Sequence, residues 1–208
     1  MANITVHIAI AQEWAKNHKV ENLDDFIWGA VAPDVLSWKM EGGYVTHYGD
    51  KVDVNTALDE NLMNKTHLDR YLAKNKLSTD YDKGYFLHLV TDLLFYNDFI
   101  DVAVLQKYYD EHNGEIKQCY YHDYDCTLEF VTNAFNVNYQ NTHREVVDLQ
   151  NRYGKCAIKD SPWLYSEQQL ADFIVRVAKI DLERLAQKIV LDKMTNTNAI
   201  IELVHRLL

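Results

Sequence analysis

The sequence predicts an all-α protein, a single-domain bundle of several helices. Seven glycines and two prolines in 208 residues are about a third of the average usage of about 12%, so few tight turns are expected. Apolar residues recur near the 3.6-residue period of a helix, and alternation of period two is not sustained anywhere. No repeat, low-complexity tract or linker-like stretch divides the chain, which predicts one domain over residues 1–208.

The first half of the chain contains a helix start and a buried helix. Asn22 precedes Leu-Asp-Asp-Phe-Ile-Trp-Gly-Ala, which suits an N-cap followed by acidic residues in the first turn. The central segment Phe86–Phe95 is apolar nearly all round, which is typical of a helix in the middle of its domain. Its polar exceptions, His88, Thr91 and Asp92, are spaced so that a helix places them on one face.

The second half shows further helix signals. Capping-box spacing occurs twice, at Thr142 with Glu145 and at Ser166 with Gln169. Residues 166–192 predict one long amphipathic helix, because apolar side chains follow the helical period at Leu170, Phe173, Ile174, Val177, Ile180, Leu185 and Ile189. Asn196 is expected to cap a last helix that carries Ile200, Ile201, Val204 and Leu208.

Composition narrows the classes of function. The net charge is −10 and the isoelectric point about 5.3, so general nucleic-acid binding is not expected. Three cysteines without a Cys-x-x-Cys motif favour free thiols in a cytoplasmic protein. The N-terminal residues resemble no signal peptide, and no apolar stretch reaches the length of a membrane span.

His88 and Asp92 are the most informative candidates for a site. Buried on an apolar helix, both side chains need a partner. One helical turn apart, they can bind one divalent metal together. The alternative is a buried His–Asp hydrogen bond without metal.

Two further candidates precede this helix. Pro33 disfavours a helix at Ala32, so Asp34 is expected on a turn beside small residues, where a carboxylate can approach a metal. The alternative is that Asp34 caps the next turn. His47 follows a Gly-containing loop. The alternative interpretation is that His47 is a surface histidine.

The remaining candidates are weaker. His7 lies among isoleucines and a valine, where a lone histidine is more often a satisfied core residue than a ligand. His122 and Asp125 are three residues apart, so a helix would place them on one face. The alternative interpretation is that this segment is the solvated, acidic start of a helix. The other histidines belong to no such cluster and are expected to be surface or packing residues: His18, His67, His112, His143 and His205.

Taken in order, these motifs resemble the zinc-dependent phospholipase C family, in the all-α superfamily shared with P1-type nucleases. The resemblance is carried by Thr5-Val6-His7, Gly29-Ala30-Val31-Ala32-Pro33-Asp34, Thr46-His47 and His88-Leu89-Val90-Thr91-Asp92. It implies a helical bundle of that type. It also implies that Asp34, His47, His88 and Asp92 bind one zinc, that His7 binds a neighbouring zinc, and that Asp92 bridges the two.

The chain departs from the family in three respects. No N-terminal tryptophan is present, no histidine is followed by glutamate four residues later, and no lipid-binding portion is evident. One or two zinc ions are therefore expected instead of three, with His122 and Asp125 as substitute ligands. Other divalent transition metals would be tolerated by similar ligands.

The resemblance implies a metal-dependent hydrolase of phosphate esters, chiefly phosphodiesters, that acts through a metal-activated water. Asp34 is also the candidate for orienting that water. One alternative is a non-catalytic helical module. Such a module would bind a metal, or it would bind a partner protein through a tyrosine-rich surface of Tyr108, Tyr109, Tyr120, Tyr121 and Tyr124. Another is an HD-type phosphohydrolase, because His122 and Asp123 are adjacent. The expected ligand is a small phosphate ester.

Overall fold

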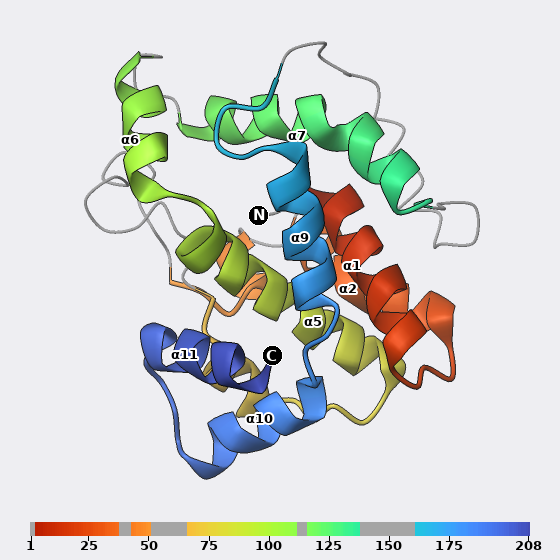
Figure 1. The fold of residues 1–208 in the computed structure, drawn as a ribbon. Coiled ribbons are helices and arrows are strands. Elements are labelled where there is room, and N and C mark those ends of the chain that lie inside the picture. Colours follow the sequence, from red (N-terminus) through yellow and green to blue (C-terminus); the bar gives the residue numbers. More distant parts are fainter. Residues whose placement is uncertain (1–2, 38–42, 51–65, 112–115, 138–160) are drawn as a thin grey trace.

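The structure is a computed structural model, shown in Figure 1, that describes residues 3–37, 43–50, 66–111, 116–137 and 161–208. These residues form ten α-helices and one π-helix and contain no strand, which confirms the predicted all-α class. The helices are α1 (Ile4–Asn17), α2 (Leu23–Ser37), α3 (Gly43–Thr46), α4 (Leu68–Leu72), α5 (Asp80–Leu94), η1 (Phe95–Phe99), α6 (Val102–Glu111), α7 (Ile116–Ala134), α9 (Glu167–Val177), α10 (Leu182–Leu191) and α11 (Thr197–Leu207). None of these helices is both long and apolar enough to cross a membrane.

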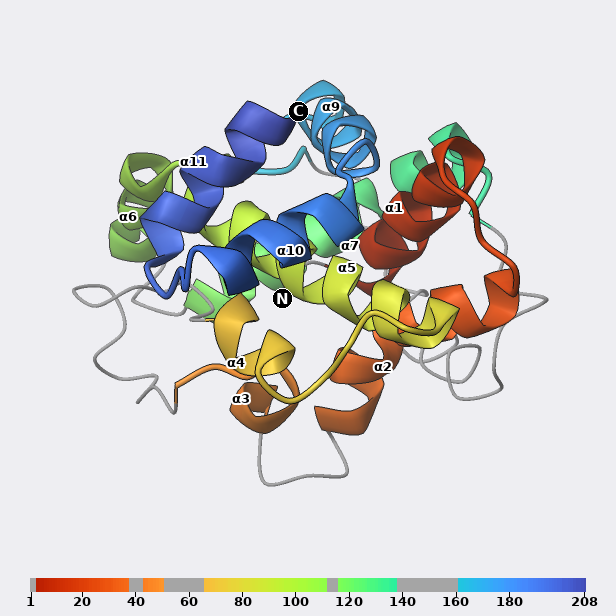
Figure 2. The ribbon, with the colours of Figure 1, turned by 90° about the horizontal axis from the view of Figure 1, so that it is seen from below.

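Helix α5 is the centre of the bundle. It contacts α1, α2, α4, α10 and α11, and every residue from Gly84 to its end is buried. In Figure 2, α9, α10 and α11 lie on one side of α5, and α2, α3 and α4 lie on the other. Its nearly unbroken apolar sequence therefore has the central position expected of it.

A close crossing holds α2 against α5, and it depends on one glycine in each helix. A Cβ atom on Gly29 would lie 2.1 Å from the carbonyl oxygen of Tyr81, and one on Gly84 would lie 2.0 Å from that of Phe26. Both distances are far below van der Waals contact, so only hydrogen fits at either position. The two backbones can therefore approach closely, which brings the polar residues of both helices into one place.

Helix α2 does not end at Ala32 as predicted but continues to Ser37 with Pro33 inside it. Proline in a helix interior leaves the carbonyl four residues earlier, that of Gly29, without its helical donor and costs about 3 kcal/mol. The surrounding turns are buried against α5, and this packing outweighs the cost. Asp34 consequently lies on a helix, not on a turn.

The predicted long helix over residues 166–192 is two helices, α9 and α10. Between them, Asp181 caps α10 by accepting a hydrogen bond from the backbone N–H of Arg184 (2.9 Å). The carbonyl of Ile180 accepts one from the indole N–H of Trp14 (2.8 Å). Both helices bury their apolar face, so the apolar period continues across the break and conceals it.

The predicted capping residues in the described part of the chain do cap helices. They are Asn22, which accepts from the backbone N–H of Asp25, Ser166, which forms a capping box with Gln169, and Asn196, which accepts from that of Ala199. The predicted capping box at Thr142 and Glu145 lies outside the described residues. Local sequence therefore predicts where these helices begin.

Candidate metal centre

Five of the predicted site residues meet in the interior of the bundle: His7 of α1, Asp34 of α2, His47 just after α3, and His88 and Asp92 of α5. All five are buried, and Asp34 is the most exposed of them at 8%. They form two overlapping groups that could hold a metal ion, one of His7, His88 and Asp92, the other of Asp34, His47 and His88.

The ring nitrogens of two histidines point at each other. Nε2 of His47 lies 3.0 Å from Nε2 of His88. Nε2 of His47 also lies 3.3 Å from Oδ1 of Asp34 and 3.3 Å from Oδ2 of Asp92. Four ligand atoms from three segments therefore lie close together, an arrangement that could hold a cation in place of the proton that His47 shares with its neighbours.

The carboxylate of Asp92 faces two ways. Its Oδ2 lies 3.5 Å from Nε2 of His88, on the side of His47. Its Oδ1 lies 3.4 Å from Nε2 of His7, whose ring stacks on that of His88 with centroids 3.8 Å apart. Asp92 can therefore serve both groups of ligands.

A backbone carbonyl fixes the tautomer of His88. Nδ1 of His88 lies 2.8 Å from the carbonyl oxygen of Ala30, which can only accept, so Nδ1 carries the proton. Nε2 then presents its lone pair to the centre. Such an outer hydrogen bond orients most histidine ligands of metals.

Helix α5 also positions His47. Nδ1 of His47 lies 3.0 Å from the hydroxyl of Thr46, and the hydroxyl of Tyr85 donates to the carbonyl of Thr46 (2.6 Å). The next residue, Tyr48, has a φ of 54°, a left-handed conformation that is uncommon for a side chain of this size. The short segment is thus anchored to α5 through Thr46, and the ring of Tyr48 packs edge-on against that of Tyr85 with centroids 6.3 Å apart.

The surroundings shift the pKa of both carboxyl groups and of His7. Burial alone would raise the pKa of Asp92, but the positive charges around it, those of the nearby histidines among them, hold that pKa well below its usual value. The pKa of Asp34 is also lowered, because His88 and His47 outweigh its burial. Burial lowers the pKa of His7, so this ring is neutral at neutral pH, as a metal ligand must be.

Polar atoms that make no hydrogen bond indicate that these residues could hold a metal ion. Both ring nitrogens of His7 and Oδ1 of Asp34 are buried and have no hydrogen-bond partner among the described residues. A buried polar atom without a partner costs about 1–3 kcal/mol. Nitrogen and carboxylate oxygen are ligands of zinc and related transition metals, and one divalent ion would neutralise the two buried carboxylates.

His122 and Asp125 lie on α7 and belong to neither group. The ring of His122 stacks on Trp163 with centroids 3.6 Å apart, and its Nδ1 lies 3.1 Å from Oδ1 of Asp123. Asp123 accepts hydrogen bonds from the backbone N–H groups of Trp163 and Leu164, both at 2.7 Å. This His–Asp dyad therefore holds the segment before α9 in place, which explains its burial without a metal.

Sequence reasoning missed the groups that orient the ligands. A backbone acceptor such as the carbonyl of Ala30 has no signature in a sequence. Tyr85 could be suspected, because it lies on the same apolar helix as His88 and a buried tyrosine needs a partner for its hydroxyl. The roles of Gly29 and Gly84 could be suspected from their position inside helices, which glycine disfavours.

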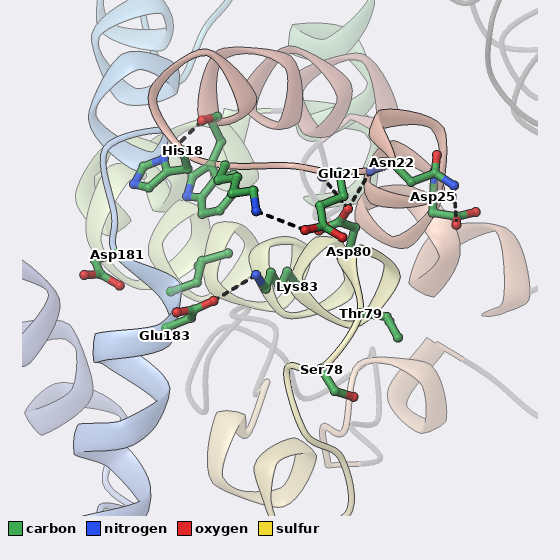
Figure 3. Close-up of a pocket in the computed structure, with 13 residues that line it drawn as sticks. His18, Glu21, Asn22, Asp25, Ser78, Thr79, Asp80, Lys83, Asp181 and Glu183 are labelled. Atoms are coloured by element: carbon green, nitrogen blue, oxygen red, sulfur yellow. Dashed lines mark hydrogen bonds and ion pairs between the residues drawn. The ribbon is translucent and has the colours of Figure 1, made fainter.

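A surface pocket of about 700 Å³ lies away from this centre, between the α1–α2 connection and the starts of α5 and α10 (Figure 3). Its charged groups bind one another. Lys83 pairs with Glu183 at 2.8 Å, and the carboxylate of Asp80 accepts from the backbone N–H groups of Glu21 and Asn22. None of the five centre residues lines the pocket.

Comparison with known proteins identifies no family. No protein-family model, no curated protein and no solved structure matches the chain. The resemblance to the zinc-dependent phospholipase C family therefore depends on the sequence motifs alone and stays a prediction.

Proposed function

We propose that the chain is a metal-dependent hydrolase of phosphate esters, with zinc as the expected metal and phosphodiesters as the expected substrates. The observation that carries this proposal is the convergence of five buried ligands, among which both nitrogens of His7 and Oδ1 of Asp34 make no hydrogen bond within the described residues. Buried ionisable groups held close together are typical of functional sites.

Each ligand has a place in this proposal. Asp34, His47, His88 and Oδ2 of Asp92 would hold one ion, because their atoms lie close together. His7 and Oδ1 of Asp92 would face a second ion. His88 can serve only one of the two ions, since the carbonyl of Ala30 occupies its Nδ1.

The chemistry that such a site supplies is a polarised phosphoryl oxygen and a bound water of lowered pKa. Asp34 is the group through which this chain would act on that water. Its side chain is 11% exposed, whereas those of His47, His88 and Asp92 are at most 1% exposed, so a molecule arriving from outside meets Asp34 first. Its lowered pKa keeps the carboxylate ionised, able to orient a water and accept its proton.

A hydrolysis panel tests the proposal. Zinc-loaded protein would be assayed on bis-p-nitrophenyl phosphate, p-nitrophenyl phosphate and a short-chain phosphatidylcholine. We expect turnover of at least one diester, loss of turnover in a chelator, and recovery when zinc is restored. Metal-loaded protein without turnover on any ester would overturn the hydrolase proposal.

The burial of the centre favours a second candidate, a non-catalytic module stabilised by its metal. Structural zinc sites are closed, whereas catalytic ones keep an open position, and four of the five residues here are at most 1% exposed. Under this candidate the protein binds zinc tightly, unfolds when the metal is removed, and hydrolyses no ester. The same panel therefore separates the two candidates.

A further inference from the structure

Three residues other than glycine have a left-handed backbone in the described part of the chain: Tyr48 (φ 54°), Asn136 (φ 48°) and Lys193 (φ 49°). Each of them lies just after the end of a helix, α3, α7 or α10. Glycine is the usual residue at such a position, because it has no Cβ atom to clash. The three turns can therefore be compared with one another.

The same pair of hydrogen bonds closes all three helices. After α3, the backbone N–H groups of Tyr48 and Gly49 donate to the carbonyls of Val45 (3.4 Å) and Tyr44 (2.9 Å). This pair is the Schellman motif, which ends many helices. It recurs after α7 and α10 with the left-handed residue at the equivalent position. In α3 the residue before it is His47, so the motif fixes the backbone from which this candidate ligand projects.

The side chain of Tyr48 distinguishes its turn from the other two. The other two left-handed residues are exposed, whereas Tyr48 is half-buried and packs against the core. Its ring lies edge-on to those of Tyr71 in α4 and Tyr85 in α5, with centroids 5.2 and 6.3 Å apart. Its hydroxyl accepts a hydrogen bond from the side-chain amide of Asn75 (3.0 Å). These contacts connect the turn after α3 to two other helices.

His47 needs such a connection more than the other candidate ligands do. His7, Asp34, His88 and Asp92 lie on helices of 14 or 15 residues. His47 follows a helix of only four, and so short a helix is not stable by itself. The position of the His47 ring therefore depends on what the turn contacts. A left-handed backbone is costly for a large side chain, and residues held in this way cluster at ligand-binding sites.

We propose that Tyr48 is a positioning residue of the candidate metal centre. Its ring holds the turn after α3 against α4 and α5, so that Nε2 of His47 stays 3.0 Å from Nε2 of His88 and within reach of both carboxylates. Glycine would end the helix with less strain but could not make these contacts. This inference rests on the metal centre of the function proposed above and on no step of the hydrolysis.

Two substitutions of Tyr48 test the role of its ring. Tyr48→Gly keeps the left-handed turn and removes the ring, whereas Tyr48→Phe keeps the ring and removes only the hydroxyl. Zinc affinity would be measured by competition with a chromophoric chelator. We expect zinc binding about tenfold weaker in Tyr48→Gly, as for other groups that orient a ligand, and nearly full affinity in Tyr48→Phe.

The visible absorption spectrum of bound Co²⁺ is the second readout, because it reports the geometry of the ligands. It should change in Tyr48→Gly and stay as in wild type in Tyr48→Phe. A residue that contributed only to overall stability would not alter this spectrum in protein that is still folded. Thermal unfolding of each metal-free variant shows that it is folded.

Lys193→Gly is the matched control, since it makes the same change at the equivalent position after α10, where the side chain is exposed. It should not lower the unfolding temperature, because glycine relieves the strain of the left-handed backbone, and it should leave zinc affinity and the Co²⁺ spectrum unchanged. Equal zinc affinity and equal Co²⁺ spectra in wild type and Tyr48→Gly would overturn the inference. Wild type that binds no zinc would overturn it as well.

The panel of esters separates this inference from the proposed function. Hydrolysis by wild type, with unchanged zinc affinity in Tyr48→Gly, leaves the hydrolase standing and removes the role of Tyr48. Weaker zinc binding in Tyr48→Gly, without hydrolysis of any ester by wild type, keeps Tyr48 as a positioning residue and removes the hydrolase.

Discussion

His47 is the residue through which pH should control metal binding. Burial alone would lower the pKa of its ring, but the carboxylates of Asp34 and Asp92 raise it to about 9. In metal-free protein the ring therefore keeps its proton at neutral pH. A metal that binds Nε2 must displace this proton, so the affinity rises as the proton becomes easier to remove.

We expect the zinc affinity to rise about tenfold per pH unit between about pH 7 and pH 9 and to level off above that, since one proton is released. Competition with a chromophoric chelator at several pH values measures the affinity. Calorimetry in two buffers of different ionisation enthalpy counts the proton. An affinity that does not change over this range would show that His47 is not a protonated ligand.

Tyr85 makes a second prediction at the scale of single residues. Its hydroxyl donates to the carbonyl of Thr46 at 2.6 Å and so holds the backbone beside His47. Tyr85→Phe should lower the free energy of unfolding by about 1 kcal/mol and weaken zinc binding severalfold. The matched variant Tyr71→Phe should lose similar stability and keep its zinc affinity. Equal zinc affinity in the two variants would contradict this role of Tyr85.

Spacing within one helix made part of the site predictable. His88 and Asp92 had to share a face once their segment was helical, and the structure places them together. The same rule applies to His122 and Asp125 on α7, yet His122 stacks on Trp163 instead of joining the centre. Sequence spacing fixes which residues share a face of a helix, but the neighbour which that face meets is decided by tertiary packing.

At the scale of the elements, the crossing of α2 and α5 is the contact on which the site depends. In Gly84→Ala, the new Cβ would lie 2.0 Å from the carbonyl oxygen of Phe26, so the helices must separate. We expect a loss of about 1–3 kcal/mol in urea unfolding, although alanine is the better helix former. Asn198→Ala, at an exposed position of α11, should change stability by about 0.5 kcal/mol or less. Equal stability of Gly84→Ala and wild type would mean that the helices do not cross at this distance.

Helix starts were predictable because capping is local, whereas two helix boundaries were not. Pro33 favours an end to α2, but burial of the surrounding turns keeps the helix intact to Ser37. Conversely, the apolar period of residues 166–192 runs through the break before α10, where Asp181 and the bond from Trp14 to Ile180 turn the chain. In both cases long-range packing outweighs the local signal.

At the scale of the whole molecule, a metal at this centre should stabilise the fold, because its ligands come from four separate segments. At a free zinc concentration of about 100 times the dissociation constant, binding contributes about 2.7 kcal/mol. For a chain of this length that corresponds to a rise in Tm of about 5–10 °C. Thermal unfolding with zinc and with a chelator measures the difference, and Asp92→Asn should show none. An equal Tm with zinc and with chelator in wild type would contradict a metal that links the helices.

The all-α class followed from composition and period, which are properties of the whole chain. The depth of the site was less predictable: His47 could as well have been a surface residue, and the structure buries it beside the contact between Tyr85 and Thr46. The close approach of α2 and α5 likewise depends on how two distant glycines meet. No local sequence pattern predicts such contacts between distant segments.

The most direct test of the central claim is the metal content of the purified protein, measured by inductively coupled plasma mass spectrometry. Wild type, Asp92→Asn and the exposed control Asp192→Asn would be prepared without an affinity tag of histidines and without chelator, then supplied with zinc and desalted. We predict one or two equivalents of zinc in wild type and in Asp192→Asn, and a large loss in Asp92→Asn. Wild type without metal, or Asp92→Asn with as much metal as wild type, would contradict the assignment of these five residues as a metal centre.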